Sequence, residues 1–117
     1  MQTINSLNKR RRAILVLELL QIQPNYAYQL IKHVSAHMSK STLYCTLKGL
    51  EGAGFIAGEQ IRTANSPVQY CYTLTASGVK FLSQEKLAYT LDVAAAVAWC
   101  KQTYAHLTTL QNSLLGK

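Results

Sequence analysis

The spacing of apolar residues changes from helical to alternating at Gly54, and this change constrains the fold more than any other feature of the sequence. Before Gly54, apolar residues recur every three or four positions, as on one face of a helix. After Gly54, the segments FIAGEQIRT and VQYCYTLT alternate between apolar and polar residues, as strands do. Residues 64–67, ANSP, supply a turn between them. The pattern predicts a β-hairpin that follows a helical region.

Two helices are predicted at the start of the chain. Residues 1 to about 7 are expected to form a loose arm, and a first helix is expected from about Ser6 to the position before Pro24. A second helix is expected to open at Asn25, a favourable N-cap residue, and to continue to His37. Its core side would carry Ala27, Leu30, Ile31 and Val34.

A third helix is expected from Ser41, with Gly54 as a left-handed cap beyond its C-terminus. Its apolar stripe is Leu43, Leu47 and Leu50. The opposite face then carries small side chains and one lysine: Thr42, Cys45, Lys48, Gly49 and Gly52. Small donors, acceptors and methyl groups can approach base edges closely, whereas a carboxylate there would be repelled by phosphate. The same composition also fits a helix face that is simply exposed.

A long final helix follows the hairpin. Thr75 is expected to cap it, and no proline interrupts the chain from there to about Ser113. Three helices, a hairpin wing and a further helix form the winged helix-turn-helix arrangement, in which the third helix enters the DNA major groove. We therefore predict a mainly α fold with a two-stranded hairpin. Residues 1–82 would form the winged helix-turn-helix domain, and residues 83–117 a C-terminal dimerisation helix.

The charge balance favours a polyanionic partner. The sequence has 12 Lys and Arg residues against 5 Asp and Glu residues, a formal charge of +7. Nucleic acid or an anionic membrane surface would suit such a charge. No apolar run approaches the roughly 20 residues needed to span a bilayer, and the N-terminal segment lacks the apolar part of a secretory signal. We expect a cytoplasmic protein without a membrane partner.

Catalytic and metal sites are not expected. Asp92 is the only aspartate, and no nucleophile with its base and no glycine-rich phosphate loop can be assembled from the sequence. His33 and His37 have the spacing of a two-histidine metal site, but no nearby Cys or carboxylate completes a ligand set. Three cysteines at wide spacings fit neither a disulfide framework nor a zinc knuckle. We expect no enzyme activity, no metal and no cofactor.

A series of residues between positions 13 and 82 matches a known family in order and spacing. The matches are Pro24, Tyr26, Tyr28 and Leu30, then Thr42, Leu43, Tyr44, Lys48, Leu50, Glu51, Gly54 and Ile56, then Tyr70, Tyr72, Leu74, Thr75 and Gly78. On these residues the chain resembles the PadR-type transcriptional regulators. The resemblance implies a dimeric, repressor-like DNA-binding protein whose C-terminal helix forms the dimer and whose DNA affinity responds to a small-molecule effector. Ala27 stands where the family usually has glycine, and residues 62–68 contain one basic residue where many members have a basic wing.

Ten residues are candidate DNA contacts. The lysines of the third helix would meet phosphates, the tyrosine hydroxyl would reach a phosphate, and the small polar residues would face bases. The arginines of the first helix and of the hairpin could reach the DNA backbone. Solvent-exposed lysines and arginines without a DNA contact are the alternative. The candidates are Lys40, Ser41, Thr42, Tyr44, Cys45, Lys48, Arg62, Arg10, Arg11 and Arg12.

The long final helix is expected to form a homodimer. Its apolar stripe is longer than a small winged domain could cover, and the run VAAAVAWC is apolar on every side. Trp99 could stack on a flat ligand near the dimer seam or simply fill the interface. The candidate interface residues are Tyr89, Val93, Val97, Trp99, Cys100, Tyr104 and Leu107.

The function predicted from these features is that of a sequence-specific transcriptional regulator, a repressor that binds a roughly palindromic operator as a homodimer. Two other functions fit the same fold. A sequence-tolerant DNA organiser, such as a plasmid-segregation protein, would use the same positive charge. A winged-helix adaptor for protein interactions would have the weakly basic wing and the sparse charge of this sequence.

Overall fold

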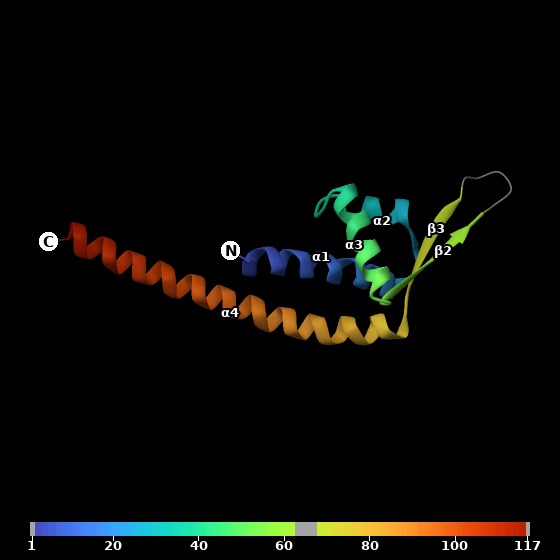
Figure 1. Ribbon diagram of the computed structural model, residues 1–117. Coiled ribbons are helices and arrows are strands. Elements are labelled where there is room, and N and C mark those ends of the chain that lie inside the picture. The colour runs from blue at the N-terminus through green and yellow to red at the C-terminus, as the bar shows by residue number, and fades with distance from the viewer. Residues whose placement is uncertain (1, 63–67, 117) are drawn as a thin grey trace.

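The computed structural model describes residues 2–62 and 68–116 (Figure 1). The elements follow the predicted order of three helices, a hairpin and a long helix. They are α1 (Gln2–Ile22), β1 (Asn25–Tyr26), α2 (Ala27–Val34), α3 (Lys40–Gly52), β2 (Ile56–Ile61), β3 (Gln69–Leu74) and α4 (Ala76–Leu115). The predicted turn at residues 64–67 lies outside the described residues. The winged helix-turn-helix arrangement is confirmed.

Helix α1 is the central element of the fold. It contacts α2, α3, β3 and α4, and its side chains Val16, Leu17 and Leu20 are buried. The helix ends at Ile22, as predicted, because the position before a proline disfavours helical backbone. The predicted arm at residues 1–7 was wrong, since the helix begins at Gln2. Its first residues, QTINSL, include neither proline nor glycine, so nothing in them stops the helix.

The sheet has a third strand that the sequence analysis missed. Asn25 was predicted to be an N-cap, but Asn25 and Tyr26 form the short strand β1, which pairs antiparallel with Tyr72 and Cys71 of β3. The strand order is β1-β3-β2. Helix α2 therefore begins at Ala27, and the N–H of Tyr26 donates to Oε1 of Gln29 at 3.1 Å. Helix α2 ends at Val34 rather than at His37.

Helix α3 is fixed at both ends by its own sequence. The Oγ atom of Ser39 accepts a hydrogen bond from the N–H of Thr42 at 3.2 Å, which satisfies one free donor of the first turn. Gly54 has a φ of 84° and provides the left-handed cap that was predicted. The predicted apolar stripe is buried: Leu43, Leu47 and Leu50.

Helix α4 is capped as predicted, because Oγ1 of Thr75 accepts from the N–H of Gly78 at 3.0 Å. Gly78 packs against the carbonyl of Phe55, where a Cβ atom would find no room. The helix then continues without a break to Leu115. Figure 1 shows its first half beside α1 and its second half extending past the N-terminus of α1. The fold is therefore elongated, with extents of 79 × 27 × 21 Å.

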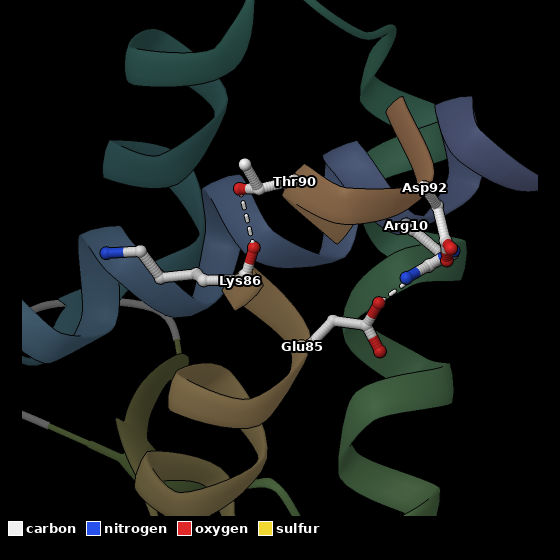
Figure 2. Close-up of polar contacts among 5 residues, drawn as sticks. All are labelled: Arg10, Glu85, Lys86, Thr90 and Asp92. Carbon is white, nitrogen blue, oxygen red and sulfur yellow. Dashed lines mark hydrogen bonds and ion pairs between the residues drawn. The ribbon is translucent and has the colours of Figure 1, made fainter. Parts of the chain in front are cut away.

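Ion pairs join α1 to α4 (Figure 2). Nε of Arg10 lies 2.6 Å from Oε1 of Glu85, and Nη1 of Arg10 lies 2.6 Å from Oδ2 of Asp92. The hydrogen bonds to Asp92 and then to Glu85 raise the pKa of Arg10. A second pair joins Nζ of Lys86 to Oε1 of Glu18 at 2.7 Å. Three of the five acidic residues thus lie in this α1–α4 seam.

Candidate nucleic-acid interface

The solvent-facing side of α3 brings together five of the predicted DNA contacts. Because Leu43, Leu47 and Leu50 turn inward, the residues about 100° or more away from them turn outward. Nζ of Lys40 lies 6.0 Å from the ring centroid of Tyr44, within reach of a cation–π contact. The residues of this exposed face are Lys40, Ser41, Tyr44, Cys45 and Lys48. We call them the α3 face.

Thr42 lies at the margin of the α3 face rather than on it. Its side chain is half-buried, and its Oγ1 atom accepts from Oγ of Ser39 at 2.9 Å. Thr42 lines a groove of about 610 Å³ between α1 and α3. Ser41 and Cys45 line the same groove, so Thr42 lies on the edge of the α3 face that turns toward α1.

The three arginines of α1 point in three directions, since neighbouring helical residues are about 100° apart. Arg10 is held in the α1–α4 seam by two carboxylates. Arg11 is exposed. Arg12 is half-buried and lines the groove beside α3, together with Lys9. The arginine run therefore does not form one basic surface, and Lys9 and Arg12 are its members nearest to α3.

The wing carries two polar residues that the sequence analysis missed. Gln60 and Tyr70 face each other across β2 and β3, and Nε2 of Gln60 donates to the hydroxyl of Tyr70 at 2.7 Å. Both side chains are exposed, as is Arg62 just after β2. The alternating pattern did place Tyr70 on the same strand face as Tyr72. It gave no sign that Tyr70 is exposed whereas Tyr72 is buried.

Three of the acidic residues lie away from the α3 face, and a fourth, Glu51, lies at its C-terminal end. Glu18, Glu85 and Asp92 are paired in the α1–α4 seam, away from α3. Glu51, at the C-terminal end of α3, accepts a hydrogen bond from the N–H of Gly58. Lys40 and Lys48 are the charged residues of the α3 face. Such a face attracts phosphate and holds small side chains where base edges could approach.

The candidate dimer residues lie along the exposed part of α4. A groove of about 550 Å³ between the start of α1 and the middle of α4 is lined by Leu7 and Asn8 together with Tyr89, Val93, Val97, Cys100 and Tyr104. Trp99 and Leu107 are not part of its lining, and 55% of Trp99 and 57% of Leu107 are exposed. The structure thus places five of the seven candidates on one face of the helix.

The histidines with the spacing of a metal site lie outside the α3 face. His33 and His37 are both exposed. Within residues 2–62 and 68–116, no three His, Cys, Asp or Glu side chains gather closely enough to hold a metal ion. Cys45, Cys71 and Cys100 are free thiols. Over the same residues, no helix has the length and apolar character needed to cross a membrane.

A match to a family sequence model shows which family the chain belongs to. The sequence model of the "Transcriptional regulator PadR-like family" matches residues 16–84, from the middle of α1 to the first part of α4. The chain belongs to the PadR-like family of transcriptional regulators. Family membership confirms the resemblance drawn from the sequence motifs, and it confirms that this PadR-like chain is a regulator rather than an enzyme.

Solved PadR-like structures share the fold. A PadR family regulator from Eggerthella lenta is 26% identical, with a TM-score of 0.68 over 87% of this chain and 91% of its own. A PadR-like transcription factor from Bacteroides fragilis is 21% identical, with a TM-score of 0.65 over 92% of this chain and 99% of its own. PadR from Bacillus subtilis, solved with operator DNA, is 24% identical, with a TM-score of 0.57 over 62% of this chain and 44% of its own. No curated protein matches the sequence at a significant level.

Proposed function

We propose that this PadR-like chain is a cytoplasmic, sequence-specific DNA-binding repressor that acts as a homodimer on a roughly palindromic operator. The observation that carries the proposal is the α3 face, which is exposed and combines two lysines with a tyrosine and two small side chains, Ser41 and Cys45. It lies on the helix that enters the major groove in winged helix-turn-helix proteins. The Bacillus subtilis relative, which was solved with operator DNA, supports the same use of the fold.

Each residue of the α3 face has a role in this proposal. Lys40 and Lys48 contact phosphates, and the free N–H groups at the start of α3 add to the site of Lys40. The hydroxyl of Tyr44 donates to a phosphate. Ser41 and Cys45 face base edges, with Thr42 at the margin of the contact. The exposed wing residues Gln60, Arg62 and Tyr70 follow the DNA next to α3.

The apolar surface of α4 supports the homodimer. Val97 is 47% exposed, Tyr104 is 74% exposed and Leu107 is 57% exposed in the single chain. A continuous apolar stripe of this length is unfavourable in water unless another surface covers it. A two-fold dimer through α4 would present two α3 helices to half-sites about one DNA turn apart. Trp99 borders this surface, and a flat effector stacked on it would change the spacing of the two α3 helices.

Selection of duplex DNA from a random library tests the sequence specificity. We expect the full-length protein to select a two-fold sequence and to bind it at least about 10³-fold more tightly than a scrambled duplex at one fixed salt concentration. Equal binding to both duplexes would indicate a sequence-tolerant organiser, and binding to neither would indicate an adaptor. A reporter gene placed behind the selected sequence should lose expression when the protein is present. A rise in expression would make the protein an activator.

Two variants test which residues touch DNA. Lys48→Ala should weaken binding to the selected and scrambled duplexes alike and lower the salt slope by about one. Cys45→Gln should instead change the selected sequence or cost roughly 1–3 kcal/mol on the original one. An unchanged salt slope would exclude Lys48 from the interface, and an unchanged sequence and affinity would exclude Cys45.

Sedimentation equilibrium tests the dimer. The full chain should have twice the 13.0 kDa mass of one chain. The double substitution Val97→Glu and Leu107→Glu should halve that mass, because it buries two unpaired charges in the interface. Gln102→Glu is the control, since Gln102 is exposed and turned away from the groove-lining face. A wild-type chain that stays monomeric at micromolar concentration would contradict the dimer and the palindromic operator.

A further inference from the structure

A side chain of α3 forms a hydrogen bond with the base of the wing. Oε2 of Glu51, in the last turn of α3, accepts a hydrogen bond from the N–H of Gly58 at 3.1 Å. Gly58 lies on β2, which is an edge strand of the sheet. Along such an edge, alternate N–H groups have no neighbouring strand to bond. Glu51 takes one of these donors and thereby fixes one point of the wing to the end of α3.

Gly58 leaves no space for a side chain at this contact. A Cβ atom on Gly58 would lie 2.8 Å from Oε2 of Glu51 and 3.0 Å from Cε1 of Tyr72. Among the described glycines, the one with a positive φ is Gly54, so close approach rather than backbone conformation accounts for glycine at this position. Tyr72 pairs with Gly58 in the hairpin and is 9% exposed. The carboxylate of Glu51, the backbone of Gly58 and the ring of Tyr72 are therefore in close contact.

Glu51 holds its negative charge near the surface that we propose to meet DNA. Burial, and then the charge of Glu51, raise the pKa of Tyr72, as expected for an ionised carboxylate close to the ring. A carboxylate in this position would repel phosphate and weaken DNA binding. The hydrogen bond to Gly58 offers a reason for a carboxylate at this position, because a fixed contact there would orient the wing relative to α3.

We propose that Glu51 is a positioning residue for the wing. It holds β2 and β3 at a fixed angle to α3, so that Gln60, Arg62 and Tyr70 reach DNA while the α3 face lies in the major groove. This inference rests on the proposed DNA-binding function, and it gives a separate role to a residue that faces the wing rather than the DNA.

Two substitutions that remove the same charge test this role. Glu51→Ala removes a carboxylate and its hydrogen bond, whereas Glu59→Ala removes a carboxylate on the neighbouring strand position. Within the described residues, the side chain of Glu59 forms no hydrogen bond or ion pair. We expect Glu59→Ala to bind the selected duplex as tightly as wild type or about twofold more tightly, because a repulsive charge is lost. We expect Glu51→Ala to bind about tenfold more weakly, because loss of a hydrogen bond to a charged group frees the wing. Equal affinities for the two variants would overturn the proposal.

A double-mutant cycle separates positioning from a general loss of stability. Arg62→Ala should weaken binding about threefold in the wild-type protein and have almost no effect in the Glu51→Ala protein, because a wing that has moved has no contact left to lose. Glu51→Gln, which keeps an acceptor oxygen, should retain the wild-type effect of Arg62→Ala. Additive effects of Glu51→Ala and Arg62→Ala would refute the positioning role.

A loss of DNA binding must be distinguished from a loss of folding. Circular dichroism should show wild-type helix content for each variant. If Glu51→Ala does not fold, Gly58→Ala replaces it, because the added methyl group displaces β2 while the carboxylate stays. Gly58→Ala should then abolish the effect of Arg62→Ala, and retention of that effect would contradict the inference. A wild-type protein that selects no duplex would instead refute the proposed function, before any variant is compared.

Discussion

Every hydrophobic side chain that is buried within the described residues lies between Val16 and Leu82, whereas α4 beyond Leu82 leaves most of its large apolar side chains exposed. Among these exposed side chains, the exposed fraction ranges from 46% at Leu110 to 82% at Leu114. The two regions use similar residues, and one continuous helix belongs to both. Apolar content alone therefore does not determine where a chain completes its core. The first region buries its apolar side chains within one chain, whereas the second needs another surface to cover its apolar side chains.

Truncating one leucine in each region tests most strongly whether that region is packed within one chain. Leu47→Ala should lower the free energy of unfolding by about 2–5 kcal/mol, because it leaves a cavity at a side chain that is 1% exposed. Leu107→Ala should change stability only at protein concentrations where dimers form. Denaturant unfolding at two protein concentrations measures both effects. A large loss for Leu107→Ala in the monomer would show that its region is packed within one chain.

Two glycines test the packing of the first region, because Gly78 is in close contact with its neighbours whereas Gly49 has free space around its Cβ position. Gly78→Ala should destabilise the fold by about 1–3 kcal/mol or more, since its Cβ would meet the carbonyl of Phe55. Gly49→Ala should stabilise the fold by up to about 1 kcal/mol, because no heavy atom lies within 4 Å of its Cβ position and alanine favours helix. Thermal unfolding measures both. A destabilising Gly49→Ala would mean that the surface beside α3 is less open than the structure shows.

The α1–α4 seam is where the two regions meet, and Arg10 tests its strength. Arg10→Met should destabilise the protein by about 1 kcal/mol, since partly exposed ion pairs are individually weak. Arg11→Met is the matched control, because Arg11 is exposed and forms no ion pair within the described residues. Thermal melts in low and high salt compare the two variants. The difference between them should shrink in high salt, and a difference that is unchanged by salt would contradict an ionic contribution.

The smallest expected effect compares a buried tyrosine with an exposed one. Burial raises the pKa of Tyr72 above its ordinary value of 10.0. The unfolded chain therefore ionises first, so the contribution of Tyr72 is complete below about pH 10 and is lost as the pH rises through its folded-state pKa. Tyr72→Phe should remove part of the stability loss at high pH. Tyr104→Phe should not, because Tyr104 is 74% exposed. Equal pH profiles for the two variants would contradict the burial of Tyr72.

Local signals predicted most of the fold. The cap at Thr75, the glycine at position 54 and the period of the leucines in α3 act over a few residues, and the structure confirms them. Strand β1 could not be predicted, because two residues have no detectable period and their partners lie on β3. The preference of Asn25 for an N-cap position gave no warning that it belongs to a strand.

The site was predictable where the core fixes the direction of a helix and unpredictable where a partner is distant in sequence. Burial of the leucines in α3 turns the α3 face outward, so the outward positions of Cys45 and Lys48 followed from spacing. The spacing did not place Lys40, Ser41 or Tyr44 on that face. The ion pairs of Arg10 could not be predicted, because its carboxylate partners lie 75 and 82 residues further along the chain. The contact of Glu51 with Gly58 depends on how the wing packs against α3, and the contact of Gln60 with Tyr70 depends on the register of the hairpin.

Helix α4 is continuous on both sides of Asp92, which pairs with Arg10 of α1, so a rigid tilt of the helix at Asp92 would be carried to its far end. From Asp92 to Leu115 the helix extends about 34 Å at 1.5 Å per residue. A tilt of about 5° at Asp92 therefore moves the far tip by about 3 Å, and the same geometry converts displacement at the tip into rotation beside α1. Because α1 also packs against α3, a partner that tilts the far end of α4 would also change the direction in which α3 points.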